Sequence, residues 1–174
     1  MNRLQQAWVW LRRIGHCRGF GIQSPTDYRF VRYVVNESWP YYAYAELGTA
    51  DDWLRSKLGR LYFRLANFLQ PDAVVDLLGY EEYQHAGCRK AVVSNSPSEH
   101  ASLALVPTSI SREELAAICG NSMKVVVVEG TGKLLKTQME ILKSMKATVV
   151  FDLYYCAVAF FDPQRSVQTY IVNF

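Results

Sequence analysis

The sequence predicts an α/β fold, a layered domain in which helices cover a mostly parallel sheet. Three observations predict it. Before Pro71, apolar residues recur at helical spacing. After Pro71, short apolar runs alternate with polar or helical segments, which is the pattern of strands joined by crossover helices. One of these runs, 124–128, is continuous and bounded by turn residues, as expected of a strand buried on both faces.

The composition is that of a single soluble domain. The chain has 174 residues, of which half are apolar and a fifth are charged, and this length is enough for a sizeable core. We expect one domain, 1–174, with a helical N-terminal part, 1–70, and an α/β sheet part, 71–174. The net charge of +3 is small, so nucleic acid is not an expected partner.

The four cysteines are widely separated and never form a C-x-x-C pair. Because no secretory signal is evident, this pattern predicts reduced thiols in a cytoplasmic protein. No cysteine or histidine pair has the spacing of zinc ligands, so no metal site is expected. The apolar run 153–161 is too short to cross a bilayer, and we expect no membrane span.

Two or three helices are expected in the N-terminal part. Residues 3–14 mix aromatic, aliphatic and arginine side chains, which fits a helix lying on a membrane or a helix packed on its own domain or on a partner subunit. The packed helix is favoured. Ser24-Pro25 begins the second helix, because serine can cap and proline suits the first helical position. Apolar spacing predicts the third helix over 51–69.

The sheet part contains seven expected strands. Ser111 and Glu114 form a capping box that starts a helix within this part, and Thr131 opens another helix. The last two strands are expected to pair through an Asp162-Pro163 turn. The expected strands are 73–78, 91–93, 103–106, 124–128, 148–152, 156–161 and 168–173.

One turn has the position of a phosphate-binding loop. Gly130, Gly132 and Lys133 lie between an expected strand and an expected helix, where such a loop belongs. A P-loop also needs a glycine and a Ser or Thr at positions held here by Val127 and Leu134. A nucleoside triphosphatase is therefore rejected, and the segment is interpreted as a turn.

No catalytic group can be named from spacing alone. The three histidines have no nucleophile or acid at a recognisable distance, so no hydrolytic triad is predicted. Asp51-Asp52 could be a carboxylate pair, but at a helix start it is better explained by compensation of the helix dipole. Asp152 lies inside an apolar run and must end a strand, face a cleft or find a partner. Structural pairing is favoured for it.

Several segments resemble bacterial class I methyltransferase-like proteins that use S-adenosylmethionine. Segment 16–25, which contains Gly21-Ile22-Gln23-Ser24-Pro25, is similar to a His–Gly–Ile–His–Ser–Pro type segment of that family. The resemblance covers 13–78 and 124–174. It implies a three-layer Rossmann-like methyltransferase fold with a mostly parallel sheet, antiparallel C-terminal strands and N-terminal helices. The further similar segments are 41–42, 57–65, 149–161 and 170–174.

The resemblance implies an S-adenosylmethionine site after the first strand. Asp76 matches the acid of the family and Gly79 its first glycine. Glycine is used there because the backbone must close around the ligand. Ser94 lies where the second strand of the family ends in an acid that holds the ribose. Tyr41 and Glu129 are expected in the cleft around this site.

The cofactor loop departs from the family pattern. Leu78 intervenes before Gly79, and Tyr80-Glu81-Glu82 replaces the small residues. These bulky side chains would block close approach of the cofactor. Ser94 can form hydrogen bonds but lacks the charge of a carboxylate. The stretch 76–152 is also short, so we expect one strand–helix unit to be reduced or missing.

Two hypotheses of function follow. The first is an S-adenosylmethionine-dependent methyltransferase-like protein with a degenerate cofactor loop, whose activity is weak or lost and whose substrate is unknown. The second is a non-catalytic protein that keeps the fold for interaction and dimerises through Trp8, Trp10 and other N-terminal aromatics. A less favoured third is an RNA-associated domain that uses Arg12, Arg13 and Arg18.

Overall fold

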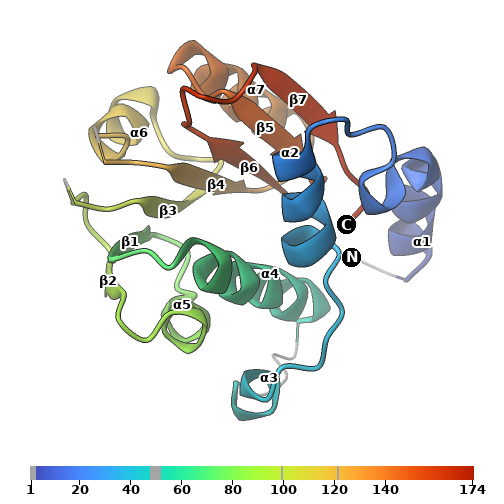
Figure 1. Cartoon of the computed structure of the whole chain (residues 1–174), viewed down its shortest axis with the longest axis horizontal. Coiled ribbons are helices and arrows are strands. Elements are labelled where there is room, and N and C mark those ends of the chain that lie inside the picture. The colour runs from blue at the N-terminus through green and yellow to red at the C-terminus, as the bar shows by residue number, and fades with distance from the viewer. Residues whose placement is uncertain (1–2, 48–51, 99, 121) are drawn as a thin grey trace.

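The computed structural model describes residues 3–47, 52–98, 100–120 and 122–174, and it confirms the α/β prediction. A central sheet has helices on both faces (Figure 1). The helical elements include the short 3-10 segment η1 and the π-helical segment η2. They are α1 (Arg3–Arg12), η1 (Ile14–Gly19), α2 (Pro25–Phe30), η2 (Val31–Val35), α3 (Ala43–Glu46), α4 (Trp53–Leu69), α5 (Glu81–Gly87), α6 (Arg112–Ile118) and α7 (Gly132–Ser144).

The described strands form one sheet in the order β2-β1-β3-β4-β6-β5-β7. All neighbours in it are parallel except β6, which is antiparallel to both β4 and β5. The sheet is therefore mostly parallel and compatible with a Rossmann-like layered architecture. The strands are β1 (Ala73–Asp76), β2 (Val92–Ser94), β3 (Leu103–Pro107), β4 (Val125–Glu129), β5 (Val149–Asp152), β6 (Cys156–Phe160) and β7 (Gln168–Ile171).

The expected pairing of the last two strands is wrong. β7 pairs in parallel with β5, and β6 lies on the other side of β5. The Asp162-Pro163 segment therefore carries the chain past β5 to the edge of the sheet and does not close a hairpin. Of the described C-terminal strands, β6 alone runs antiparallel to its neighbours.

Each face of the sheet has its own apolar core. Along β4, Val125 and Val127 pack in the core beneath α2, α4 and α5, whereas Val126 and Val128 pack beneath α6 and α7. This alternation explains why the run is continuously apolar. On the first face Phe30 of α2 contacts the rings of Phe151 and Phe160 at 4.8 and 4.9 Å between centroids.

Local signals place the helix starts where they were expected. Ser24 Oγ accepts a hydrogen bond from Asp27 N, and the Ser111–Glu114 capping box is complete. Asp52 Oδ1 accepts from Leu54 N at the start of α4, while Asp51 lies outside the described residues. Thr131 precedes α7, but its side chain makes no capping hydrogen bond.

The connection from β2 to β3 contains no helix among its described residues, 95–98 and 100–102. Elsewhere in the parallel part, α6 links β3 to β4 and α7 links β4 to β5. This agrees with the expectation that one strand–helix unit is reduced.

Asp152 has the structural role that was favoured for it. Its carboxylate accepts from Arg13 Nη2 at 2.6 Å, and Arg13 Nη1 donates to the carbonyls of Asp152 and Val172. Asn173 adds two bonds, from its N–H to the His16 carbonyl and from Nδ2 to the Trp10 carbonyl. The N-terminal helix is thus attached to the last residues of the chain.

Candidate functional site

The candidate site lies at the carboxyl edge of the sheet, where β1 has β2 on one side and β3 on the other. Ligands of open α/β sheets bind at such a point, beyond the strand ends where the order reverses. Asp76, Ser94 and Glu129 are the last residues of β1, β2 and β4. Three of the five predicted site residues therefore lie along one edge of the sheet.

The carboxylate of Asp76 is occupied by its own loop. Its Oδ1 accepts from the N–H groups of Leu78 and Gly79 at 2.8 and 3.0 Å, and its Oδ2 accepts from Tyr80 N at 2.6 Å. Gly79 has a φ of +73°, a left-handed conformation that glycine adopts without strain. Asp76 thus fixes the turn between β1 and α5, and three of its acceptor positions are already used.

Tyr80 lies immediately after this turn and is 2% exposed. Its ring packs edge-on against Tyr62 of α4 at 4.7 Å between centroids. The guanidinium of Arg55 covers the ring at 4.3 Å from the centroid. Arg55 also donates to the Leu78 and Gly79 carbonyls at 3.4 and 2.5 Å. The loop is therefore held by two side chains: the ring of Tyr80 is buried beside it, and Arg55 binds its carbonyl groups.

Glu129 faces the same cluster from the end of β4. Tyr62 donates its hydroxyl to Glu129 Oε2 at 2.8 Å. Burial raises the pKa of Glu129 above its ordinary value, and hydrogen bonds from Tyr62 and Tyr80 and the charge of Arg55 only partly oppose this. The negative charge of Asp76 adds to the increase in pKa. Asp76 and Glu129 therefore share one electrostatic environment.

A buried thiol completes the neighbourhood of Glu129. Cys156 is the register partner of Glu129 on β6 and is fully buried. Burial, followed by the charges of Glu129 and Asp152, raises the pKa of this thiol well above its ordinary value. Since a thiolate is the reactive form of cysteine, Cys156 is an inert core residue and not a nucleophile.

The other two predicted residues, Ser94 and Tyr41, have contacts of their own. Ser94 Oγ donates to the Ser96 carbonyl, next to β1. Tyr41 packs against Phe63 of α4 and Tyr44 of α3. It lines a cavity of about 540 Å³ whose other lining residues are Glu37, Ser38, Trp39, Pro40, Tyr44, Ala45, Arg60 and Arg64. The structure therefore joins Asp76, Gly79 and Glu129, and it leaves Tyr41 elsewhere.

Two residues of the cluster, Tyr62 and Arg55, were not predicted as site residues from the sequence. Tyr62 lies within the helix that apolar spacing predicts over 51–69, but that spacing gives no sign of the hydroxyl bond to Glu129, 67 residues away. Arg55 is one of several basic residues on α4, and its bonds to the loop depend on the packing of that helix.

The turn that follows β4 differs from a phosphate loop. Gly130 has a φ of +155°, and a Cβ at this position would lie 2.4 Å from the Thr108 side chain. Glycine is therefore required here by close packing against the β3–α6 turn. This is the glycine-containing turn that was expected.

The cluster could hold or release one proton at Glu129, but Asp76 and Arg55 are already bonded to the loop backbone and Tyr62 to Glu129. Within the described part of the chain, no three His, Cys, Asp or Glu side chains come together as a metal site would need. None of the described helices has the length and apolarity to cross a membrane. Comparison with protein-family models, with curated proteins and with solved structures found no match.

Proposed function

We propose that this chain is a methyltransferase-like protein whose own residues occupy the place of S-adenosylmethionine, and that it acts by binding a partner. Its most direct support is the pair Asp76 and Tyr80. The acid expected to face the cofactor holds three loop N–H groups, and the tyrosine that replaces a small residue is buried beside it.

Three features support descent from a methyltransferase-type fold. The sheet is mostly parallel with a reversed strand near its C-terminal end, helices precede it, and the unit after β2 is reduced. These are the features that the resemblance implies for a shortened member. The carboxylates of Asp76 and Glu129 remain at the edge of the sheet.

The surface of α1 supports the binding role. Leu4, Trp8 and Leu11 recur at helical spacing and are 80%, 56% and 58% exposed, and Ile14 of η1 continues the stripe. A helix on a soluble domain normally turns such a stripe toward the core. Here Val9 and Arg13 face the domain instead. A second copy of the chain, with the same stripe, would cover it in a symmetric dimer.

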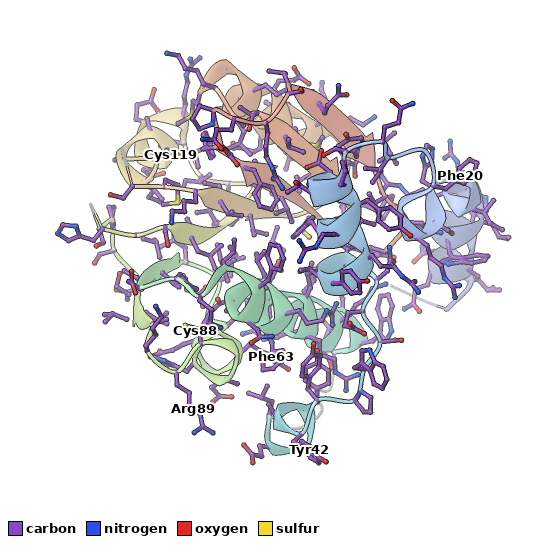
Figure 2. All side chains as sticks on the ribbon, in the orientation of Figure 1. Phe20, Tyr42, Phe63, Cys88, Arg89 and Cys119 are labelled. Atoms are coloured by element: carbon purple, nitrogen blue, oxygen red, sulfur yellow. The ribbon has the colours of Figure 1, made fainter. Side chains whose placement is uncertain are left out.

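Two further aromatic side chains are exposed, of which Tyr42 was expected at an interface and Phe20 was not. Phe20 and Tyr42 are 84% and 94% exposed and point away from the body of the protein (Figure 2). Tyr42 is the residue preceding α3, which lies below α4 and apart from α1 (Figure 1). The two regions are therefore separate surfaces, and of the two it is α1 that carries a continuous apolar stripe.

Titration with S-adenosylmethionine tests the proposal. We expect neither heat of binding by calorimetry nor a rise in melting temperature at millimolar cofactor. A ligand present at a hundred times its dissociation constant would stabilise the folded state by about 2.7 kcal/mol, which a thermal scan resolves. A methyltransferase that binds the cofactor serves as the positive control.

Variants of Tyr80 and Asp76 sharpen the result. Tyr80→Phe keeps the ring and should leave the unfolding free energy within about 1 kcal/mol of the wild type. Tyr80→Ala empties the space and should cost about 3–5 kcal/mol, as large core truncations do. Saturable binding of the cofactor by the wild type, weakened by Asp76→Asn, would contradict the proposal and favour a weakly active methyltransferase.

A further inference from the structure

A cavity of about 530 Å³ lies between α1 and the beginning of α4. Most of its wall is aromatic and consists of the rings of Trp10, Trp53, Tyr155 and Phe174. Tyr155 immediately precedes β6, whose first residue pairs with the last residue of β4, so the cavity lies near the edge of the sheet where β4 ends. Among the described residues that line it, Lys57 alone has a charged side chain. The cavity is therefore an apolar pocket that contains one amine.

The amine of Lys57 is surrounded by aromatic rings. Its Nζ lies 5.1 Å from the ring centroid of Trp53, 5.6 Å from that of Tyr155 and 4.3 Å from that of Phe174. Within the described part of the chain, this amine forms no ion pair with a carboxylate and donates no hydrogen bond. The side chain is only partly buried and lines the cavity, so a ligand in the cavity can reach Nζ.

This environment favours the uncharged amine. Burial lowers the pKa of Lys57 to about 8, an effect that Cys156 opposes and the charge of Arg64 reinforces. Burial also raises the pKa of Tyr155 and that of Cys156, so neither neighbour supplies a negative charge to hold the ammonium form. The rings attract an ammonium group but accept no strong hydrogen bond from it. At pH 7 roughly a tenth of an amine with this pKa is uncharged, compared with about one in three thousand at the ordinary value of 10.5.

We propose that Lys57 forms a reversible imine with an apolar aldehyde that binds in this cavity. The lone pair of the uncharged Nζ attacks the carbonyl carbon, a C–N bond forms, and the carbonyl oxygen takes a proton as its π bond breaks. The carbinolamine then expels this oxygen as water, whose two hydrogens come in net from the amine, and the nitrogen lone pair forms the C=N bond. Nothing is oxidised or reduced, and water reverses the reaction by hydrolysis. Lysines in apolar pockets are suited to this chemistry because their amine is more often uncharged.

The cavity wall restricts the class of aldehyde. Four aromatic rings favour a ligand with an aromatic or aliphatic body. The described lining residues offer no second charged side chain to pair with a charged group on the ligand. The volume is in the range of sites for small organic molecules. None of the stripe residues Leu4, Trp8 and Leu11 lines the cavity, so the proposal is independent of a partner bound to α1.

Reductive trapping on the wild-type chain tests the proposal. The protein is incubated at pH 7 with 2-naphthaldehyde and cyanoborohydride, which reduces an imine to a stable secondary amine. Peptide mass spectrometry then gives the rate of modification at each amine. We expect Lys57 to be modified at least tenfold faster than any other lysine.

The α-amino group of the chain provides an internal standard, because such a group ordinarily has a pKa of about 8. With acetaldehyde, which has no apolar body, the ratio of modification at Lys57 to that at the α-amino group should be at least fivefold lower than with 2-naphthaldehyde. This comparison separates binding in the cavity from the reactivity of the amine alone.

Variants locate the reaction. Lys57→Arg keeps the positive charge but cannot form an imine, and it should leave the modification of all other amines unchanged. Trp53→Leu removes one ring of the wall and should lower the ratio of modification at Lys57 to that at the α-amino group at least threefold with 2-naphthaldehyde. Phe68→Leu is the matched control, because Phe68 lies on the same helix, is 43% exposed like Trp53, and is not a lining residue of the cavity.

The wild-type measurements decide the proposal even if a variant fails to fold. Modification of Lys57 no faster than that of the other lysines would overturn it, as would the same ratio to the α-amino group with both aldehydes. Saturable binding of 2-naphthoate, with no trapping of 2-naphthaldehyde at Lys57, would also overturn it and would indicate a carboxylate site instead.

Discussion

At Glu129, burial and hydrogen bonding act on the pKa of the carboxyl in opposite directions. Its carboxylate accepts from Tyr62, lies near Arg55 and Asp76, and is enclosed at the end of β4. Burial is the largest influence, and the pKa is raised. A carboxyl with a raised pKa in the folded state binds its proton more tightly there than in the unfolded chain.

Glu129→Gln should therefore change the pH dependence of stability. Between the raised folded pKa and the ordinary value near 4.5, the folded state holds more protons, so this group makes the free energy of unfolding rise as pH falls. The amide of the variant cannot titrate but can still accept from Tyr62, and the rise attributable to this site should disappear. Urea unfolding at a series of pH values measures the difference, with the exposed Glu140→Gln as control. Identical pH profiles for wild type and Glu129→Gln would show that the carboxyl is not perturbed.

At the scale of elements, helix starts were predictable and strand pairing was not. Ser24-Pro25 and the Ser111–Glu114 box mark α2 and α6 because capping depends on residues only three positions apart. The position of β7 depends on which strand edge is free after β6 has entered between β4 and β5. No local turn signal indicates which strand edge is free, and for this reason the Asp162-Pro163 turn suggested a hairpin.

The two N-cap positions of α6 and α7 offer a matched pair of variants. Ser111 receives a hydrogen bond from the N–H of Glu114, whereas the side chain of Thr131 makes none. We expect Ser111→Ala to lower the free energy of unfolding by about 1 kcal/mol, typical of a lost N-cap. Thr131→Ala should cost less than about half of that. Urea denaturation of both variants gives the comparison, and equal losses would mean that the Ser111 bond adds nothing.

In the candidate site, too, the residues that follow a local pattern were predicted and those that depend on tertiary packing were not. Asp76 and Gly79 were found because they follow a recognisable strand, and the replacement of small residues by Tyr80 is visible in the sequence. The partners that enclose Tyr80 come from α4, a helix that precedes β1 and crosses the sheet. Their identity depends on tertiary packing, so Tyr62 and Arg55 could be predicted only as core and surface residues of a helix.

At the scale of the whole molecule, the feature that calls for a partner is the exposed apolar stripe of α1. The helix is held by Arg13, Val9 and the Asn173 bonds, so its orientation is fixed with Leu4, Trp8 and Leu11 outward. Exposed patches of this kind on a soluble domain mark interaction sites. The proposed occupant is the same stripe of a second copy.

Light scattering and sedimentation should then show a dimer whose population rises with protein concentration. Trp8→Glu and Leu11→Glu change exposed side chains and should give folded monomers, because they place like charges opposite each other in a symmetric interface. Tyr42→Glu, on the separate α3 side, is the control and should leave the dimer intact. A wild-type chain that stays monomeric at all concentrations, or that instead pellets with anionic lipid vesicles, would refute self-association through α1.

The bonds that join Arg13, Trp10 and His16 with residues 152, 172 and 173 also constrain the order of folding. A ribosome delivers residues in order from the amino end, yet the attachment site of α1 is made from residues that follow it by 139 to 163 positions. The helix must therefore stay undocked until that later segment has been synthesised, while its apolar side chains stay accessible to chaperones. Docking of α1 therefore requires that β5, β6 and β7 have already assembled.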